Sequence, residues 1–184
     1  MTLDSSERSI SRCAHPLIIA ALAAGLAQSA VASPVNTIDP RVRSSSPQIV
    51  AAIQEAAERS TTFHRLIETV DASNGIVFVE QGECGHGVRS CLLHSVVVAA
   101  NNRILRIIVD TRQSKWDLMG SIGHELYHAV EVLSNPSLAT SEAVFFFYMR
   151  SGSMSPTALE TSAAIQAGNA VRREVEHDRH RDAS

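Results

Sequence analysis

The chain has 184 residues, of which 45% are hydrophobic, and a formal net charge of -3. This length and composition fit one globular domain with a core of ordinary size. Charges of both signs are interspersed along the chain, so there is no basic stripe of the kind that phosphate backbones attract. We therefore do not expect nucleic acid as a partner.

Residues 1–32 have the three parts of a secretory signal peptide. Two arginines precede an apolar run over residues 17–27, and small residues then predict cleavage near Ala32-Ser33. The run is shorter than the roughly 20 residues of a membrane span, which argues against an uncleaved anchor. Cys13 precedes the run, whereas a lipidated cysteine would follow it. We expect a secreted or periplasmic protein with no stable membrane anchor after cleavage.

Two of the three cysteines, Cys84 and Cys91, follow the signal peptide. In an oxidising compartment such a pair forms a disulfide by default, and we predict one here. The alternative is a metal site that Cys84 and Cys91 form with His86 and His94, because these residue types ligate zinc. Their spacing matches no common zinc ribbon, so the disulfide is favoured.

The first part of the mature chain predicts a leader and one helix. Residues 33–47 are rich in Ser, Pro and Arg without hydrophobic periodicity, which indicates a flexible leader. Over residues 48–70, apolar side chains recur mostly at helical spacing, and Gly75 follows as a terminator. We expect the folded domain to begin with this helix.

Three short β-branched segments then predict strands, at residues 76–79, 95–99 and 103–109. Asn101-Asn102 lies between the last two and predicts a hairpin. Residues 103–109 alternate imperfectly between apolar and polar side chains, so one face of the sheet should be partly exposed.

The remaining sequence predicts helices over residues 115–133, 138–150 and 156–176, followed by a charged tail at residues 177–184. The expected fold is an α+β zincin-like domain over residues 48–176. It consists of an N-terminal helix, a short mainly antiparallel sheet, an active-site helix and two further helices.

The chemical signal is His124-Glu125-Leu126-Tyr127-His128, inside an otherwise apolar helix. Histidines four residues apart lie on one helix face, so both imidazoles can bind a single metal ion. The adjacent Glu125 can act as the base that activates water. The alternative is a pair of core histidines, but burying His124, Glu125 and His128 on an apolar helix is costly without a shared partner.

A catalytic zinc needs a third protein ligand, for which the candidates are Glu131, Glu142 and Glu160. Glu131 lies about 10 Å along the helix axis from His124, so it is better interpreted as a partner that orients His128 or as a solvated residue. Glu142 would reach the site if the chain reverses after the helix, although it also suits a helix N-terminus. Glu160 shares a helical face with small apolar residues and should point inward. We favour Glu160 over Glu142 and keep both.

Residues 122–129 together with residues 160–164 resemble the gluzincin metallopeptidases, which take a third zinc ligand from a glutamate on a later helix. The chain is especially similar to a group of small exported bacterial proteins that carry this motif pair, and the resemblance covers about residues 76–171. It implies a Zn²⁺ site with His124, His128 and Glu160 as ligands and Glu125 as catalytic base. The metzincin branch is disfavoured because no third histidine follows at its spacing.

Two further expectations concern substrate binding. In zincins an edge strand beside the active-site helix binds an extended substrate, and residues 103–109 are a candidate for that strand. Tyr148 or His94 could donate a second hydrogen bond to the oxyanion, although a buried aromatic and a surface histidine are the simpler interpretations. Tyr127 should turn away from the metal face.

The sequence therefore predicts zinc-dependent hydrolysis of peptide bonds in an extracytoplasmic protein or peptide. The alternative is an exported non-catalytic binding domain that retains a zincin-like fold. Glu125 favours catalysis, because a structural zinc uses four protein ligands and no adjacent base. A chance occurrence of the motif would predict no zinc at all.

Overall fold

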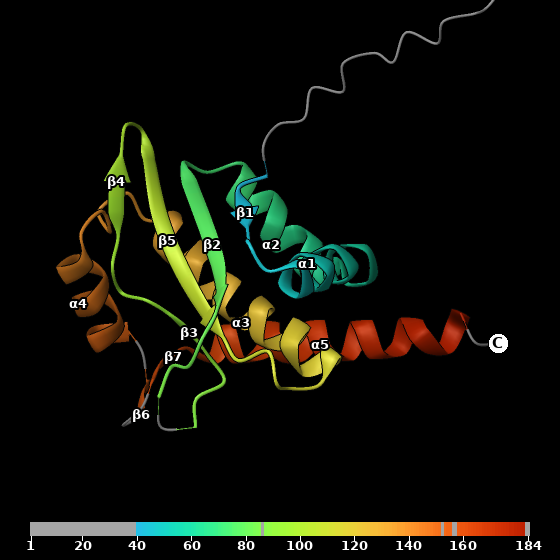
Figure 1. Ribbon diagram of the computed structural model, residues 1–184. Coiled ribbons are helices and arrows are strands. Elements are labelled where there is room, and N and C mark those ends of the chain that lie inside the picture. Colours follow the sequence, from blue (N-terminus) through green and yellow to red (C-terminus); the bar gives the residue numbers. More distant parts are fainter. Residues whose placement is uncertain (1–39, 86, 152, 156–157, 183–184) are drawn as a thin grey trace, which may run out of the picture. The chain divides into compact units, whose positions relative to one another are not determined.

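The computed structural model describes residues 40–85, 87–151, 153–155 and 158–182, so the predicted signal peptide and residues 33–39 lie outside the described part. The described residues form an α+β fold (Figure 1). Its helices are α1 (Pro47–Arg59), α2 (Thr61–Asp71), α3 (Lys115–Leu133), α4 (Ser141–Ser151) and α5 (Ser162–Asp182). Its strands are β1 (Val42–Arg43), β2 (Gly75–Gln81), β3 (Ser90–Leu92), β4 (Val97–Ala99), β5 (Asn102–Val109), β6 (Ser153–Ser155) and β7 (Ala158–Glu160).

The main sheet is mixed, with the order β1-β2-β5-β3 and with β4 paired to another part of β5. The prediction of a mainly antiparallel sheet is wrong, because β1–β2 and β2–β5 are parallel, as in the register Val77↔Leu105. Residues 82–101 separate β2 from β5, and a connection of this length can bring the second strand back parallel. The predicted hairpin is confirmed, since β4 and β5 are antiparallel with Ala99 opposite Asn102.

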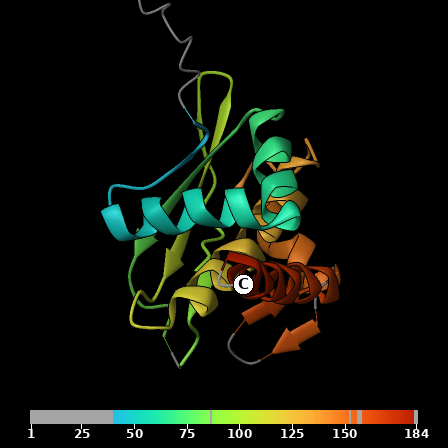
Figure 2. The same ribbon diagram turned by 90° about the vertical axis from the view of Figure 1, so that its right-hand side faces the viewer.

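Helices cover one face of this sheet. The inward side chains of β2 and β5 are fully buried, and they pack with residues of α1, α2 and α3 in one hydrophobic core. Helix α5 lies along α3 and also contacts α1 and α2 (Figure 2). On the opposite face the exposed pair Arg106–Glu80 bridges β5 and β2, in line with the predicted partly exposed face.

The single helix predicted over residues 48–70 is two helices. Ser60 interrupts it with an extended backbone (φ -122°, ψ 113°) and its hydroxyl accepts a hydrogen bond from the Phe63 amide at 3.0 Å. A serine in this position satisfies one of the free amides at a helix start. The same hydroxyl donates to Glu174 of α5 at 2.6 Å, so the break is held by tertiary contacts.

Other boundaries also differ from the predictions. The expected leader contributes Val42–Arg43 to the sheet as β1, because these residues add to the open side of β2. The helix expected from residue 156 begins at Ser162, and Thr161 caps it by accepting from the Ala164 amide at 3.2 Å. Glu160 therefore lies in strand β7. Helix α5 continues through residues 177–182 of the expected tail. Among the described helices, none has the length and apolar character needed to cross a membrane.

Helix α3 agrees with its predicted range and is fixed at both ends. At its start, the Ser114 hydroxyl accepts from the Asp117 amide at 3.2 Å. At its end, the buried guanidinium of Arg103 donates to the carbonyl oxygens of Val132 and Leu133 at 3.0 and 2.5 Å. A cation suits this end, where the helix dipole is negative.

Candidate metal centre

Helix α3 presents His124 and His128 on one face, one turn apart. Their ring centroids are 4.9 Å apart, and their side chains are 16% and 4% exposed respectively. The flanking residues of the helix are apolar and buried in the core, which fixes the face that the histidines occupy. This placement agrees with the predicted pair.

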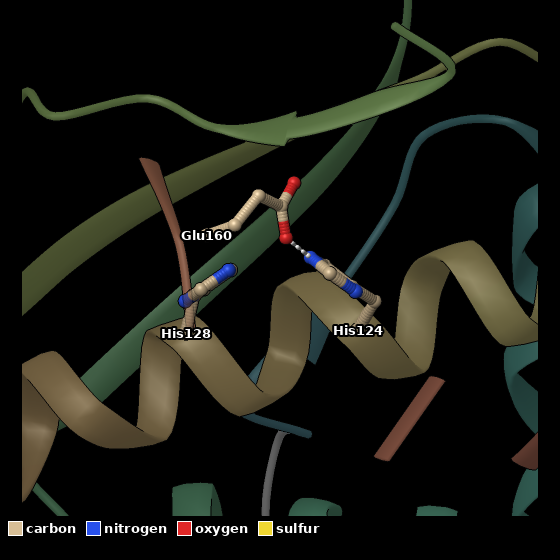
Figure 3. Close-up of side chains that lie close together, drawn as sticks. All are labelled: His124, His128 and Glu160. Atoms are coloured by element: carbon tan, nitrogen blue, oxygen red, sulfur yellow. Dashed lines mark ion pairs between the residues drawn. The ribbon is translucent and has the colours of Figure 1, made fainter. Parts of the chain in front are cut away.

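Glu160 reaches the same point from strand β7 (Figure 3). Its Oε2 lies 3.0 Å from Nε2 of His124, and one donor atom from each of His124, His128 and Glu160 lies within 4.8 Å of the other two. Glu142, the rival third ligand, is exposed in the first turn of α4 and is not part of this group. These three residues could therefore hold a metal ion, and we call them the metal group.

Two donor atoms of this group are buried without a hydrogen-bond partner among the described residues: Nε2 of His128 and Oε2 of Glu160. The 3.0 Å contact of Oε2 with His124 is an ion pair by distance, but its direction does not meet hydrogen-bond geometry. Buried polar atoms normally have partners, and an atom without one needs an explanation. Two imidazoles and a carboxylate that converge on one point fit a divalent cation.

A carboxylate on the next helical turn orients His128. Nδ1 of His128 lies 2.8 Å from Oε2 of Glu131, which leaves Nε2 to face the metal group. The other oxygen of Glu131 accepts from the Thr161 hydroxyl at 2.9 Å, and the Tyr148 hydroxyl lies 3.3 Å from Oε2. Of the two interpretations of Glu131, the structure agrees with a partner of His128, because the Glu131 side chain is only 18% exposed and contacts that ring. Thr161 adjoins Glu160, so this contact also ties the third candidate ligand to α3.

Glu125 lies beside the metal group and is buried, with 4% exposure. Burial raises the pKa of its carboxyl group, and the neighbouring histidines and the Ser90 hydroxyl only partly oppose this effect. Contact with His124 lowers the pKa of Glu160. Burial alone would lower the pKa of His124, but Glu160 and Glu125 outweigh it and raise that pKa. The metal-free site thus favours a charged His124–Glu160 pair.

Two cavities flank this group. The larger, of about 510 Å³, extends from His124 past polar residues of α3 and α5 that include Asp117 and Arg172. The smaller, of about 210 Å³, extends from His128 past Leu93 and Tyr148. Glu125 and Glu160 line both cavities, so a ligand can approach the group from either side.

The strand beside this cleft is β3, which the sequence did not predict. Residues 103–109 are not the edge strand that was expected, because β5 pairs with β2 on one side and with β3 and β4 on the other. Two hydrogen bonds show which backbone groups face β5. The Asp110 amide donates to the carbonyl of Arg89, just before β3, and the amide of Leu93, just after β3, donates to the carbonyl of Arg106. Backbone groups alternate in direction, so those of Ser90 and Leu92 face the open edge.

The predicted disulfide is confirmed, since Cys84 and Cys91 are bonded to each other. The alternative metal site at these cysteines is wrong, because neither sulfur remains a thiolate that could bind a metal. His86 lies outside the described residues, and His94 is exposed at the rim of the smaller cavity.

Tyr148 and His94, the two candidates for a second hydrogen-bond donor to the oxyanion, differ in their surroundings. The Tyr148 hydroxyl lies 3.0 Å from the carbonyl oxygen of His128 and 3.3 Å from Glu131, so protein acceptors already engage it. This arrangement favours a supporting role for Tyr148. His94 is exposed, as expected for a surface histidine, and its ring lies 6.4 Å from that of Tyr148, so it stays only a candidate for the second donor. Tyr127 is half-buried and packs against the hydrophobic core.

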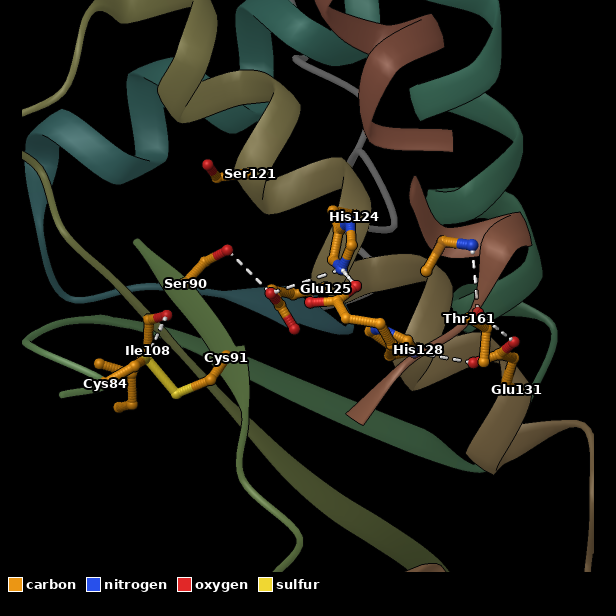
Figure 4. Close-up of polar contacts among 12 residues, drawn as sticks. Cys84, Ser90, Cys91, Ile108, Ser121, His124, Glu125, His128, Glu131 and Thr161 are labelled. Carbon is orange, nitrogen blue, oxygen red and sulfur yellow. Dashed lines mark hydrogen bonds and ion pairs between the residues drawn. A yellow bond between two sulfur atoms is a disulfide. The ribbon is translucent and has the colours of Figure 1, made fainter. Parts of the chain in front are cut away.

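Sequence reasoning missed two features of the site. Ser90 donates to Oε1 of Glu125 at 2.8 Å (Figure 4), and no periodicity or motif marks it. Glycines also let α5 approach α3: a Cβ at Gly168 would lie 2.9 Å from the carbonyl oxygen of Gly120 and 2.9 Å from Cβ of His124. Glycines in helix interiors were the available signal, since they are unfavourable there without a packing reason.

Comparisons of this chain with protein-family models, with curated proteins and with solved structures found no match.

Proposed function

We propose that this protein is a zinc metallopeptidase of the gluzincin type. The observation that carries the proposal is the convergence of His124, His128 and Glu160, with two buried ligand atoms that lack a hydrogen-bond partner among the described residues, beside the buried carboxylate of Glu125. Three protein ligands leave an open coordination position, as in catalytic zinc sites. A structural site would have a fourth protein ligand instead, whereas the candidate group within the described part of the chain has three members.

Zinc suits a donor set of two imidazoles and one carboxylate, and when bound it would act as a Lewis acid on a peptide carbonyl and on the attacking water. The residues of the chain would do the rest. Glu125 would accept the proton of the water and deliver it to the leaving amine. Glu131 would hold the ring of His128 in one orientation. Glu160 departs from the gluzincin pattern, because it lies in a strand just before a helix.

The open edge of β3 supports the proposal that the substrate is a peptide. Ser90 and Leu92 present backbone groups away from β5, beside the cavities that Glu125 lines. An extended peptide can pair with such an edge through main-chain hydrogen bonds. Because cavities flank the metal group on both sides, the cleft has room for chain on either side of a scissile bond.

We further propose that the protein acts outside the cytoplasm, on a protein or peptide there. The signal-peptide pattern of residues 1–32 supports export. The Cys84–Cys91 disulfide agrees with an oxidising compartment.

The test is metal analysis of protein purified without chelator, followed by a screen against denatured proteins and mixed peptides. We expect an equimolar amount of zinc, retained in Glu142→Ala and lost in Glu160→Ala. Glu125→Gln should keep the zinc but lower peptide hydrolysis at least about a hundredfold, the usual worth of a general base. Absence of zinc after zinc is offered back would refute the proposal. Zinc without hydrolysis would instead favour the exported non-catalytic binding domain.

A further inference from the structure

The carboxylate of Glu125 is held by a side chain from a different element. The hydroxyl of Ser90, in strand β3, donates to Oε1 of Glu125 at 2.8 Å (Figure 4). Within the described part of the chain, this is the one hydrogen bond to that carboxylate, and the nearest histidine nitrogen, Nε2 of His124, is 4.0 Å from the same oxygen. The orientation of the proposed base therefore depends on Ser90.

This dependence matters because a general base works only within hydrogen-bond reach of its proton. A glutamate side chain has several rotatable bonds, and restricting them costs free energy. A hydrogen bond that fixes one carboxylate oxygen restricts the plane of the group and leaves the second oxygen for the water. The energy of a hydrogen bond to a charged group is larger than that of a neutral one.

Ser90 is itself fixed in position. It pairs with Val109 in the register of β3 and β5, and its neighbour Cys91 is bonded to Cys84. The carbonyl of the preceding residue, Arg89, accepts from the Asp110 amide at 2.8 Å. The residues before and after Ser90 are therefore both fixed, and they hold its hydroxyl next to Glu125. The same strand has the open edge that is proposed to pair with substrate.

We propose that Ser90 is a positioning residue, which holds the Glu125 carboxylate in the orientation needed to activate water. The inference rests on the proposed peptidase function. Strand β3 would then have two roles, because it would pair with substrate and also position Glu125 through Ser90. A movement of β3 would displace the Ser90 hydroxyl from the Glu125 carboxylate.

The test compares Ser90→Ala, Ser90→Thr and the control Ser95→Ala, which alters an exposed serine shortly after the same strand. Hydrolysis is measured with a peptide found in the screen above. Ser90→Ala should lower kcat about tenfold or more, with KM changed less than about twofold and zinc content unchanged. Ser90→Thr keeps the hydroxyl and should keep most of kcat, and Ser95→Ala should match the wild type.

A second readout does not depend on turnover. Acetohydroxamic acid chelates zinc and releases its proton to a neighbouring base, so its affinity for the zinc-loaded protein reports the placement of Glu125. We expect Ser90→Ala to weaken its binding about tenfold in calorimetry. If the wild type binds zinc but cleaves nothing, the peptidase proposal fails while this titration still tests Ser90.

Unchanged kcat and unchanged hydroxamate affinity in Ser90→Ala would overturn the inference. So would loss of zinc from Ser90→Ala, because Ser90 would then support the fold of the site and not the base. A tenfold loss in both readouts with zinc retained, and its recovery in Ser90→Thr, would support it.

Discussion

The strongest stability prediction concerns Arg103, whose guanidinium binds carbonyl oxygens at the C-terminal end of α3, the helix that carries the candidate ligands His124 and His128. Its Nη1 and Nη2 atoms donate to the carbonyl oxygens of Val132, Asn135 and Leu133 at 3.0, 2.9 and 2.5 Å, and a longer contact of 3.4 Å reaches Leu138. The residue is only 6% exposed, and burial lowers the pKa of its guanidinium. We consider Arg103→Met, which keeps an unbranched stem of similar shape.

The magnitude follows from the acceptors that this change leaves unpaired. The bonds to Leu133 and Leu138 are buried, whereas that to Asn135 is partly accessible to water. The Val132 carbonyl oxygen also accepts from the Asn135 amide at 3.2 Å, so it keeps a partner. A buried acceptor without a partner costs about 1–3 kcal/mol. The change also relieves the cost of burying a cation, so we take the lower value for each of the two acceptors left unpaired. The free energy of unfolding should fall by about 2 kcal/mol, and Tm by about 7 °C.

The assay is urea unfolding of the metal-free protein, which separates the effect from metal binding. Arg106→Met is the matched control, because Arg106 lies in the same strand but forms an exposed pair with Glu80 at 2.9 Å. Such a pair contributes under about 1 kcal/mol. Arg103→Lys keeps the charge but loses the planar fork, and should fall between the wild type and Arg103→Met. A loss below about 1 kcal/mol in Arg103→Met would refute the reasoning.

Two further predictions concern the packing of α5. The Glu174 carboxylate accepts from Ser60 and Thr62 at the start of α2; burial raises its pKa, but these hydrogen bonds outweigh it and hold the pKa below the ordinary 4.5. The ionised carboxylate of Glu174 therefore stabilises the fold fully at pH values above the pKa of the unfolded chain. This stabilisation is lost as pH falls through the lower pKa of the folded protein. The difference in unfolding free energy between wild type and Glu174→Gln should thus shrink between about pH 6 and pH 3. A constant difference would contradict this. Gly168→Ala should lower Tm and zinc content, because its Cβ would meet the Gly120 carbonyl at 2.9 Å, an overlap costing about 1–3 kcal/mol. A rise in Tm, as at an open helical glycine, would show that the helices can separate without penalty.

The sequence predicted best what depends on neighbours along the chain. The range of α3 agrees because Ser114 and a run of apolar residues mark the helix locally. The pair His124 and His128 follows from helical spacing alone. The disulfide was predicted from chemistry rather than from structure, because two cysteines in a chain that is expected to be exported pair by default.

What failed depends on contacts distant in sequence. The break at Ser60 is stabilised by Glu174, which no local pattern reveals. The parallel pairing of β2 with β5 depends on the path of the residues between them. Glu160 was favoured because it was placed on an inward helical face, yet it reaches the metal group from strand β7. Glu160 thus belongs to the candidate group, although the local structure predicted for it is wrong.

The origin of Glu160 in a strand has a consequence for how the site is held. Its neighbour Thr161 both caps α5 and donates to Glu131, which in turn orients His128. The third candidate ligand is therefore linked to the second through one carboxylate, without any metal. Close packing of α5 on α3 at Gly168, next to Cβ of His124, also holds these two helices together at the metal group. Because the donors already lie within 4.8 Å of one another, a metal ion would bind a largely formed site. Its binding free energy would then go mainly into affinity rather than into ordering the chain, unlike zinc domains that fold only with their metal.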